Sequence, residues 1–187
     1  MNSFDAGSPE IGTGNANLPP FPHLGIGYLL GIATIVAEFV AVSIHPELAR
    51  EGGIPPLYLF LVSFVGGVYW FVCVYRYHVL MAHVPAWKHP ISPARAVGFH
   101  FIPFYNLYWV FKWPQEIAKF VNGRLRNPVM KPVAVGLAVL SALVLRVLDP
   151  GFGLILLFVP MSYVSGCLRR ALAAPPIPSG SLPPSSE

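Results

Sequence analysis

Four runs of apolar residues alternate with shorter polar segments along this chain of 187 residues. The runs cover about residues 24–44, 57–82, 132–148 and 152–172. Their lengths are close to the roughly 20 residues that an α-helix needs to cross the hydrocarbon core of a bilayer. The pattern predicts an all-α membrane domain over residues 23–172, built as an integral membrane four-helix bundle. Residues 1–22 and 173–187 are rich in Gly, Pro and Ser and are expected to be disordered tails.

The segment between the second and third runs has a different pattern. Residues 93–122 mix aromatic, proline and basic residues, and their most apolar part, 96–111, is at the short end of spanning length. Pro103 and Pro114 interrupt it. We expect a broken helix that lies in the cytoplasmic membrane interface or re-enters the membrane from it, because amphipathic rings concentrate at the headgroup level. A fifth membrane crossing is the alternative.

Aromatic residues of this segment form the candidate interaction surface. The predicted surface consists of Phe104, Tyr105, Asn106, Tyr108, Trp109 and Trp113. Phe104, Tyr108 and Phe111 share one helical face, at i, i+4 and i+7. This face could bind membrane lipids or a membrane-protein partner, or it could serve only to anchor the bundle. The amide of Asn106 needs hydrogen-bond partners, and the carbonyls left free before Pro103 are candidates.

The run from Pro93 to Phe111 resembles a segment with the pattern P-x-x-A-x-x-F-x-F-I-P-F-x-N-L-Y-W-x-F. Uncharacterised families of small bacterial multi-spanning inner-membrane proteins carry this pattern. The matching positions are Pro93, Ala96, Pro103, Asn106, Tyr108 and Trp109. The resemblance implies an integral protein of a bacterial inner membrane. It implies no activity and no catalytic residue.

Composition and charge agree with a membrane location. Charged residues make up only 11% of the chain, against about 25% for a soluble domain, and the mean hydropathy is +0.60. The net charge is +4, but the basic residues are interleaved with aromatic ones, so no nucleic-acid partner is expected. Ten of the twelve Lys and Arg residues lie between Arg76 and Lys131 or at Arg169 and Arg170. This distribution predicts that both termini and the middle segment are cytoplasmic.

Small residues recur at a spacing of four within the predicted spans. The predicted packing positions are Gly27 and Gly31 in the first span and Ala134, Ala138 and Ala142 in the third. Small residues allow helix backbones to approach closely in a membrane. We expect the stripes to pack the helices of one chain against each other, and a homo-oligomer is the alternative.

Two charges lie inside the predicted spans. Glu38 and Arg146 are each about 14 residues from the cytoplasmic start of their span, or about 21 Å. An unpaired charge at that depth is costly, so we expect an intramembrane ion pair between them. Asp149 is a competing partner for Arg146.

The chain has no recognisable catalytic or metal-binding motif. Its six histidines form no HExxH pair, no serine lies in a nucleophile-elbow motif and no phosphate loop is present. We expect no enzyme activity, cofactor or metal. The predicted function is an accessory or scaffold subunit that packs against a larger membrane complex or organises lipid. The alternative is a small transporter or channel-like protein that uses Glu38, His45 and Arg146.

Overall fold

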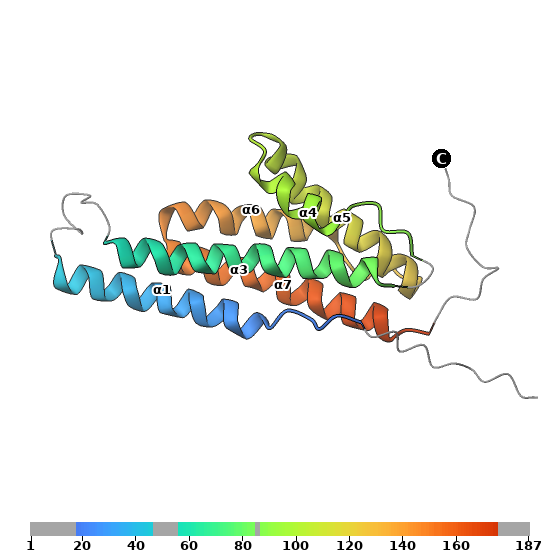
Figure 1. The fold of residues 1–187 in the computed structure, drawn as a ribbon, viewed down its shortest axis with the longest axis horizontal. Coiled ribbons are helices and arrows are strands. Elements are labelled where there is room, and N and C mark those ends of the chain that lie inside the picture. Colours follow the sequence, from blue (N-terminus) through green and yellow to red (C-terminus); the bar gives the residue numbers. More distant parts are fainter. Residues whose placement is uncertain (1–17, 47–55, 85–86, 176–187) are drawn as a thin grey trace, which may run out of the picture.

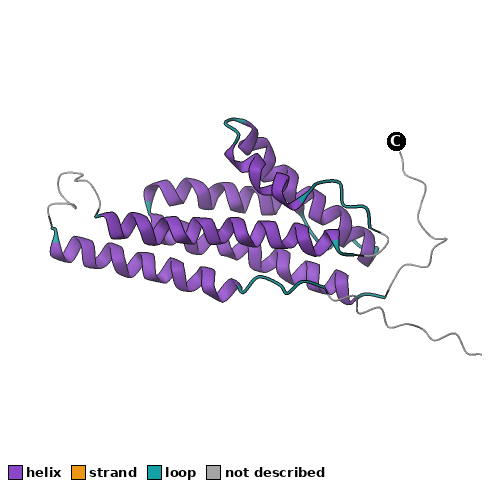
Figure 2. Ribbon diagram, viewed as in Figure 1, coloured by secondary structure: helices purple, strands orange, loops and turns teal. Residues whose placement is uncertain are grey.

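The computed structural model describes residues 18–46, 56–84 and 87–175. These residues form helices and loops, and no strand occurs among them (Figure 2). The α-helices are α1 (Leu24–Ile44), α3 (Leu57–Ala82), α4 (Pro93–Gly98), α5 (Tyr105–Leu125), α6 (Pro132–Leu148) and α7 (Pro150–Ala173). A short 3₁₀ helix, η1 (Phe99–Phe101), continues from α4. Most of the residues in the two predicted disordered tails lie outside the described residues.

Helices α1, α3, α6 and α7 lie side by side, and each of them runs opposite to the next along the chain (Figure 1). Helix α7 is central, because it contacts α1, α3 and α6, and its buried side chains include Leu154, Phe158 and Met161. The bounds of α1, α3 and α6 agree with the first three predicted runs. Helix α7 begins two residues before the fourth run, because Asp149 accepts a hydrogen bond from the Phe152 amide (2.9 Å) and Pro150 occupies the first turn.

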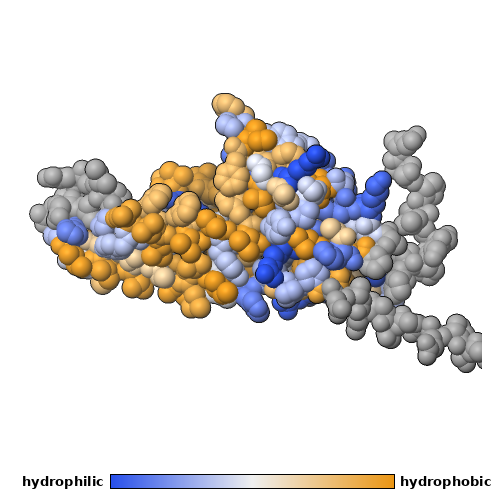
Figure 3. Space-filling view, in the orientation of Figure 1, coloured by the Kyte–Doolittle hydropathy of each residue, from blue (hydrophilic) through white to orange (hydrophobic). Residues whose placement is uncertain are grey.

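Three of these helices, α1, α3 and α7, are long and apolar enough to cross a membrane. Helix α6 is apolar but has 17 residues, which corresponds to about 25 Å. Apolar side chains cover much of the surface over the half of the molecule that holds the start of α3, whereas polar side chains gather at the opposite end (Figure 3). We call that opposite end, which contains Arg76, Lys131 and Arg170, the basic end.

A helical hairpin leans against the bundle, with its reversal standing clear of the other helices above α6 and the end of α5 lying toward the basic end (Figure 1). Its first arm is α4 with η1, its second arm is α5, and the chain reverses at residues 102–104. Phe104, directly after Pro103, has a positive φ of 61°. The predicted break at Pro103 is therefore present. The interruption expected at Pro114 is wrong, because α5 continues through Pro114 to Leu125.

The glycines predicted in α1 lie at close helix contacts. A Cβ on Gly27 would meet the ring of Phe158 at 2.2 Å, and one on Gly31 would meet Ile155 at 2.5 Å, both on α7. In α6 the prediction chose the wrong face for two of three positions, because Ala134 and Ala138 are exposed and only Ala142 is buried. The close contact of α6 is at Gly136, where a Cβ would meet the Phe111 ring of α5 at 2.5 Å.

Residues 18–22, which we expected to belong to a disordered tail, contact the basic end of the bundle. The Arg169 guanidinium lies 4.8 Å from the centre of the Phe21 ring. The Arg76 guanidinium donates to the Pro20 carbonyl at 3.3 Å, and Tyr69 donates to the His23 carbonyl at 2.8 Å. These contacts hold the chain against α3 and α7 before α1 begins.

Candidate functional site

The hairpin formed by α4, η1 and α5 is held together by aromatic side chains between its two arms. The Trp109 indole donates to the Ala96 carbonyl at 2.7 Å, which links α5 to α4. The Phe99 ring lies 4.8 Å from that of Trp109 and 5.1 Å from that of Tyr105, both in edge-to-face geometry. Such contacts stabilise beyond the area that they bury. The hairpin therefore has a small core of its own.

This core divides the predicted interaction surface into two groups. Trp109 and Trp113 are buried, with 1% and 0% of their surface exposed, so their assignment to an interaction surface was wrong. The reason is that α5 turns this face toward the α4 arm and the bundle. Phe104, Tyr105 and Tyr108 are exposed, and Asn106 is half-buried.

The exposed apolar side chains of the hairpin gather at its reversal. They are Phe101, Ile102, Phe104, Tyr105, Leu107 and Tyr108, and we call this group the apolar tip. Phe104 is 88% exposed. Figure 3 shows apolar atoms at the end of the hairpin, and polar ones along its arms toward the basic end. The carbonyl before Pro103 accepts from the Asn106 backbone amide at 3.0 Å, whereas we expected the side chain to donate.

Histidines connect the hairpin and the loop before it to α3. The His100 ring on η1 lies 5.2 Å from that of Trp70 and 5.5 Å from that of Phe71, both on α3. His78 of α3 and His89 of the loop share a hydrogen bond of 2.7 Å between Nδ1 and Nε2. We call His78, His89 and His100 the histidine contacts. In each, the second ring nitrogen is buried and has no hydrogen-bond partner among the described residues.

Burial favours the neutral form of these imidazoles. It lowers the pKa of His100 to about 4, although hydrogen bonds to the Val97 and Ala96 carbonyls act in the opposite direction. Burial also lowers the pKa of His89, against a smaller opposing effect of the nearby Glu116 carboxylate. Two bonded imidazoles need one donor and one acceptor, so the pair of His78 and His89 requires a neutral ring. Burial therefore favours an uncharged His100 at the contact between the hairpin and α3.

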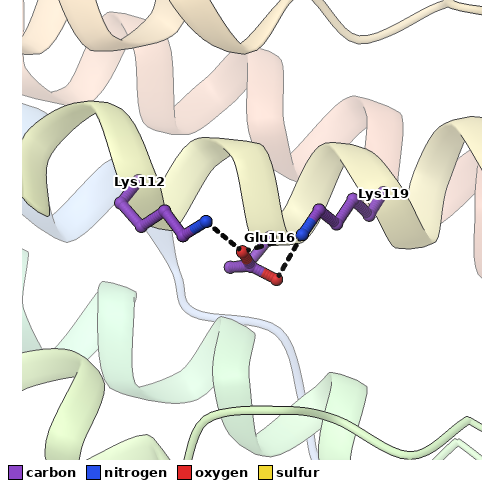
Figure 4. Close-up of polar contacts among 3 residues, drawn as sticks. All are labelled: Lys112, Glu116 and Lys119. Atoms are coloured by element: carbon purple, nitrogen blue, oxygen red, sulfur yellow. Dashed lines mark hydrogen bonds and ion pairs between the residues drawn. The ribbon is translucent and has the colours of Figure 1, made fainter. Parts of the chain in front are cut away.

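Glu116 is a buried carboxylate on α5, with 4% of its surface exposed. It lies between Lys112 and Lys119, and each lysine Nζ is 3.1 Å from its Oε1 (Figure 4). The hydrogen bond to Glu116 raises the pKa of Lys112. Sequence reasoning missed this cluster, although its signal was present: lysines at i−4 and i+3 flank the single acidic residue between positions 52 and 148.

The structure gives Glu38 and Arg146 different partners. Glu38 accepts from the Gly151 amide at 2.9 Å, and Arg146 donates to the Ser63 carbonyl at 2.6 Å and to its hydroxyl at 3.3 Å. Among the described residues no ion pair joins the two, because each finds a polar group of a neighbouring helix that it can reach. Asp149 caps α7, although we expected it to compete for Arg146.

Within the part of the chain that the structure describes, no group of three or more His, Cys, Asp or Glu side chains could hold a metal ion. Cys73 and Cys167 are buried thiols in the bundle. No protein-family model, no curated protein and no solved structure matches this chain.

Proposed function

We propose that this chain is a non-enzymatic integral membrane protein that serves as an accessory or scaffold subunit. In this proposal α1, α3, α6 and α7 cross a bacterial inner membrane as a four-helix bundle. Both termini and the hairpin lie on the cytoplasmic side. The hairpin presents its apolar tip to a partner at that surface.

The single observation that carries the proposal is the strained backbone of Phe104 combined with its exposed side chain. A bulky residue with positive φ is strained, which costs on the order of 1–3 kcal/mol. Packing within the chain does not offset this cost, because the side chain is 88% exposed. A contact outside the chain accounts for a phenylalanine at this position.

The distribution of charge supports the proposed orientation. Ten of the twelve Lys and Arg residues lie between Arg76 and Lys131 or at the end of α7, and hydrophilic residues gather toward the basic end (Figure 3). Basic residues are enriched on the cytoplasmic side of membrane proteins. The lengths and apolar character of α1, α3 and α7 support the membrane bundle itself.

The alternative function, transport through the bundle, requires a polar path that reaches Glu38. The helix contacts favour packing instead. A Cβ on Gly67 would lie 2.7 Å from the Arg146 guanidinium, and one on Gly151 would lie 3.0 Å from the Glu38 carboxylate. The side chains of Arg146 and Glu38 therefore pack against the backbone at Gly67 and Gly151, respectively. We retain transport only as the competing hypothesis.

Photo-crosslinking in native membranes tests the scaffold proposal. A photoreactive amino acid replaces Phe104 in one variant and Gly123 in a control, where a Cβ meets no atom within 4 Å. We expect adducts with a lipid or a membrane protein from position 104 and not from position 123. Equal labelling at both positions, or none at position 104, would contradict the proposal.

A further inference from the structure

The side chains around the apolar tip indicate the chemistry of its partner. We propose that the hairpin binds anionic phospholipids, with the apolar tip among the acyl chains and the cations behind it on the lipid phosphates. This inference rests on the proposed function, because it names the partner of the same hairpin.

The depth of the apolar tip fits the membrane interface. The Phe101 ring lies 4.9 Å from that of Phe71 on α3. Phe71 precedes Arg76, the first charged residue of α3, by five residues, which is about 7.5 Å along the helix. Interfacial elements insert about 5–10 Å below the headgroups. With Arg76 at the headgroup level, the tip therefore reaches the boundary between headgroups and acyl chains.

Each arm of the hairpin carries a cation at a suitable distance behind the tip. Arg95 precedes Phe101 by six residues, or about 9 Å along the first arm. Lys112 follows Phe104 by eight residues, or about 12 Å along the second arm. Arg95 is exposed, and the Lys112 side chain is 30% exposed. Both cations can therefore reach headgroups while the tip is inserted. Lys112 exchanges its contact with Glu116 for a lipid phosphate in this proposal, and Lys119 remains on that carboxylate.

The charge balance favours an anionic partner. Between positions 52 and 148 the only acidic residue is Glu116, which is buried between Lys112 and Lys119. The hairpin region and the end of α7 therefore contain ten basic residues and a single acidic residue. Clusters of basic residues next to a membrane bind anionic lipids, with about 1 kcal/mol from each cation near the surface.

Lipid titration of the purified full chain in detergent tests the inference. Native mass spectrometry at low salt measures the apparent Kd for phosphatidylglycerol and for phosphatidylcholine. We expect tighter binding of phosphatidylglycerol. The double variant Arg95→Gln/Lys112→Gln should weaken that binding by about 25-fold, or about fivefold for each cation, and leave phosphatidylcholine unaffected.

Lys119→Gln is the matched control, because Lys119 contacts the same Glu116 but lies about 10 Å further from the tip than Lys112. We expect it to weaken phosphatidylglycerol binding by less than about twofold, since screening limits more distant charges. Circular dichroism checks that each variant is folded. If a variant unfolds, Phe104→Ser replaces it, and it should weaken the binding of both lipids to a similar degree, because the tip contacts the acyl chains that they share while both cations remain.

Equal affinity for the two lipids, or an equal loss in Lys119→Gln, would overturn the inference. The photo-crosslinker at position 104 separates this failure from failure of the proposed function. An adduct with one membrane protein, and none with lipid, would overturn lipid binding and leave the scaffold role intact. Absence of both adducts would overturn both proposals.

Discussion

At the residue scale, Phe104 combines a strained backbone conformation with an exposed aromatic side chain. Phe104 follows Pro103, and its φ of 61° allows the chain to reverse between η1 and α5. A glycine would take this backbone conformation without strain. The ring is therefore dispensable for the turn and is available for a contact.

Phe104→Gly and Phe104→Ala separate these two roles. Both remove the ring, but only glycine relieves the positive φ. We expect Phe104→Gly to raise the free energy of unfolding in detergent by about 1 kcal/mol and Phe104→Ala to leave it unchanged or lower it. Both should weaken lipid binding. Equal stability of the two variants in a thermal unfolding experiment would show that residue 104 is not strained.

Glu38 and Arg146 behave as independent residues in this structure. Each is bonded to its own partner, Gly151 or Ser63. We expect Glu38→Gln and Arg146→Leu each to destabilise the protein by on the order of 1 kcal/mol, because each weakens a hydrogen bond. In a double-mutant cycle the coupling energy should be below about 0.5 kcal/mol. A larger favourable coupling energy would contradict this expectation and support the ion pair that the sequence predicts.

At the element scale, the hairpin is a unit with its own aromatic core that attaches to the bundle through contacts of different chemistry. Phe111 packs onto Gly136 of α6, whereas the histidine contacts join the hairpin and its preceding loop to α3. The first contact is apolar and insensitive to pH. The second includes His100 and His89, whose burial favours the neutral form, so acidification acts selectively on the attachment to α3.

The attachment to α3 should weaken below neutral pH. The folded-state pKa of His100 is about 4 and that of His89 is also lowered, whereas an exposed histidine titrates near 6.5. Their stabilisation is therefore present above pH 6.5 and decreases as the pH falls, and for His100 it is lost toward pH 4. For His100 this amounts to roughly 2 kcal/mol at pH 5. His78 faces both rings from α3, and Glu116 faces His89 from α5. The Glu116 carboxylate favours a charged His89, and the Ala96 and Val97 carbonyls favour a charged His100, but burial has the larger effect on both.

Hydrogen exchange of the backbone amides of residues 93–125 measures this effect. The unaltered protein and the His100→Phe variant are compared at the same pH. The phenylalanine keeps the ring contacts with Trp70 and Phe71 and removes the proton. At pH 5 we expect faster exchange in the protein than in the variant, and a smaller difference at pH 7. His83→Gln, at an exposed histidine, should behave like the unaltered protein. The same difference at both pH values would exclude titration of His100 as the cause.

At the scale of the whole molecule, the apolar pattern was sufficient to predict the helices and insufficient to predict their faces. The bounds of α1, α3 and α6 follow directly from runs of apolar residues, and Pro103 marks the break in the hairpin. Which face of α6 is buried depends on the Phe111 ring of a separate element, so spacing alone selected Ala134 and Ala138 wrongly.

The candidate site was predictable in position but not in detail. Tryptophan suits both an interface and a core, and the sequence could not show that the Trp109 indole reaches the Ala96 carbonyl. The histidine contacts involve residues up to 22 positions apart, His78 to His100, and match no motif. Glu38 and Arg146 lie at similar depths in their predicted spans, yet depth does not determine which helix faces each charge.

The depth of residue 104 in a bilayer tests the central claim most directly. A spin label is attached at Phe104→Cys or at Gly123→Cys, with Cys73 and Cys167 replaced by alanine. Its collisions with oxygen and with a water-soluble nickel chelate are then compared. We predict that the label at 104 meets mainly oxygen, about 5–10 Å below the phosphates, and that the label at 123 meets mainly nickel. A label at 104 that is as exposed to nickel as the label at 123 would contradict the account.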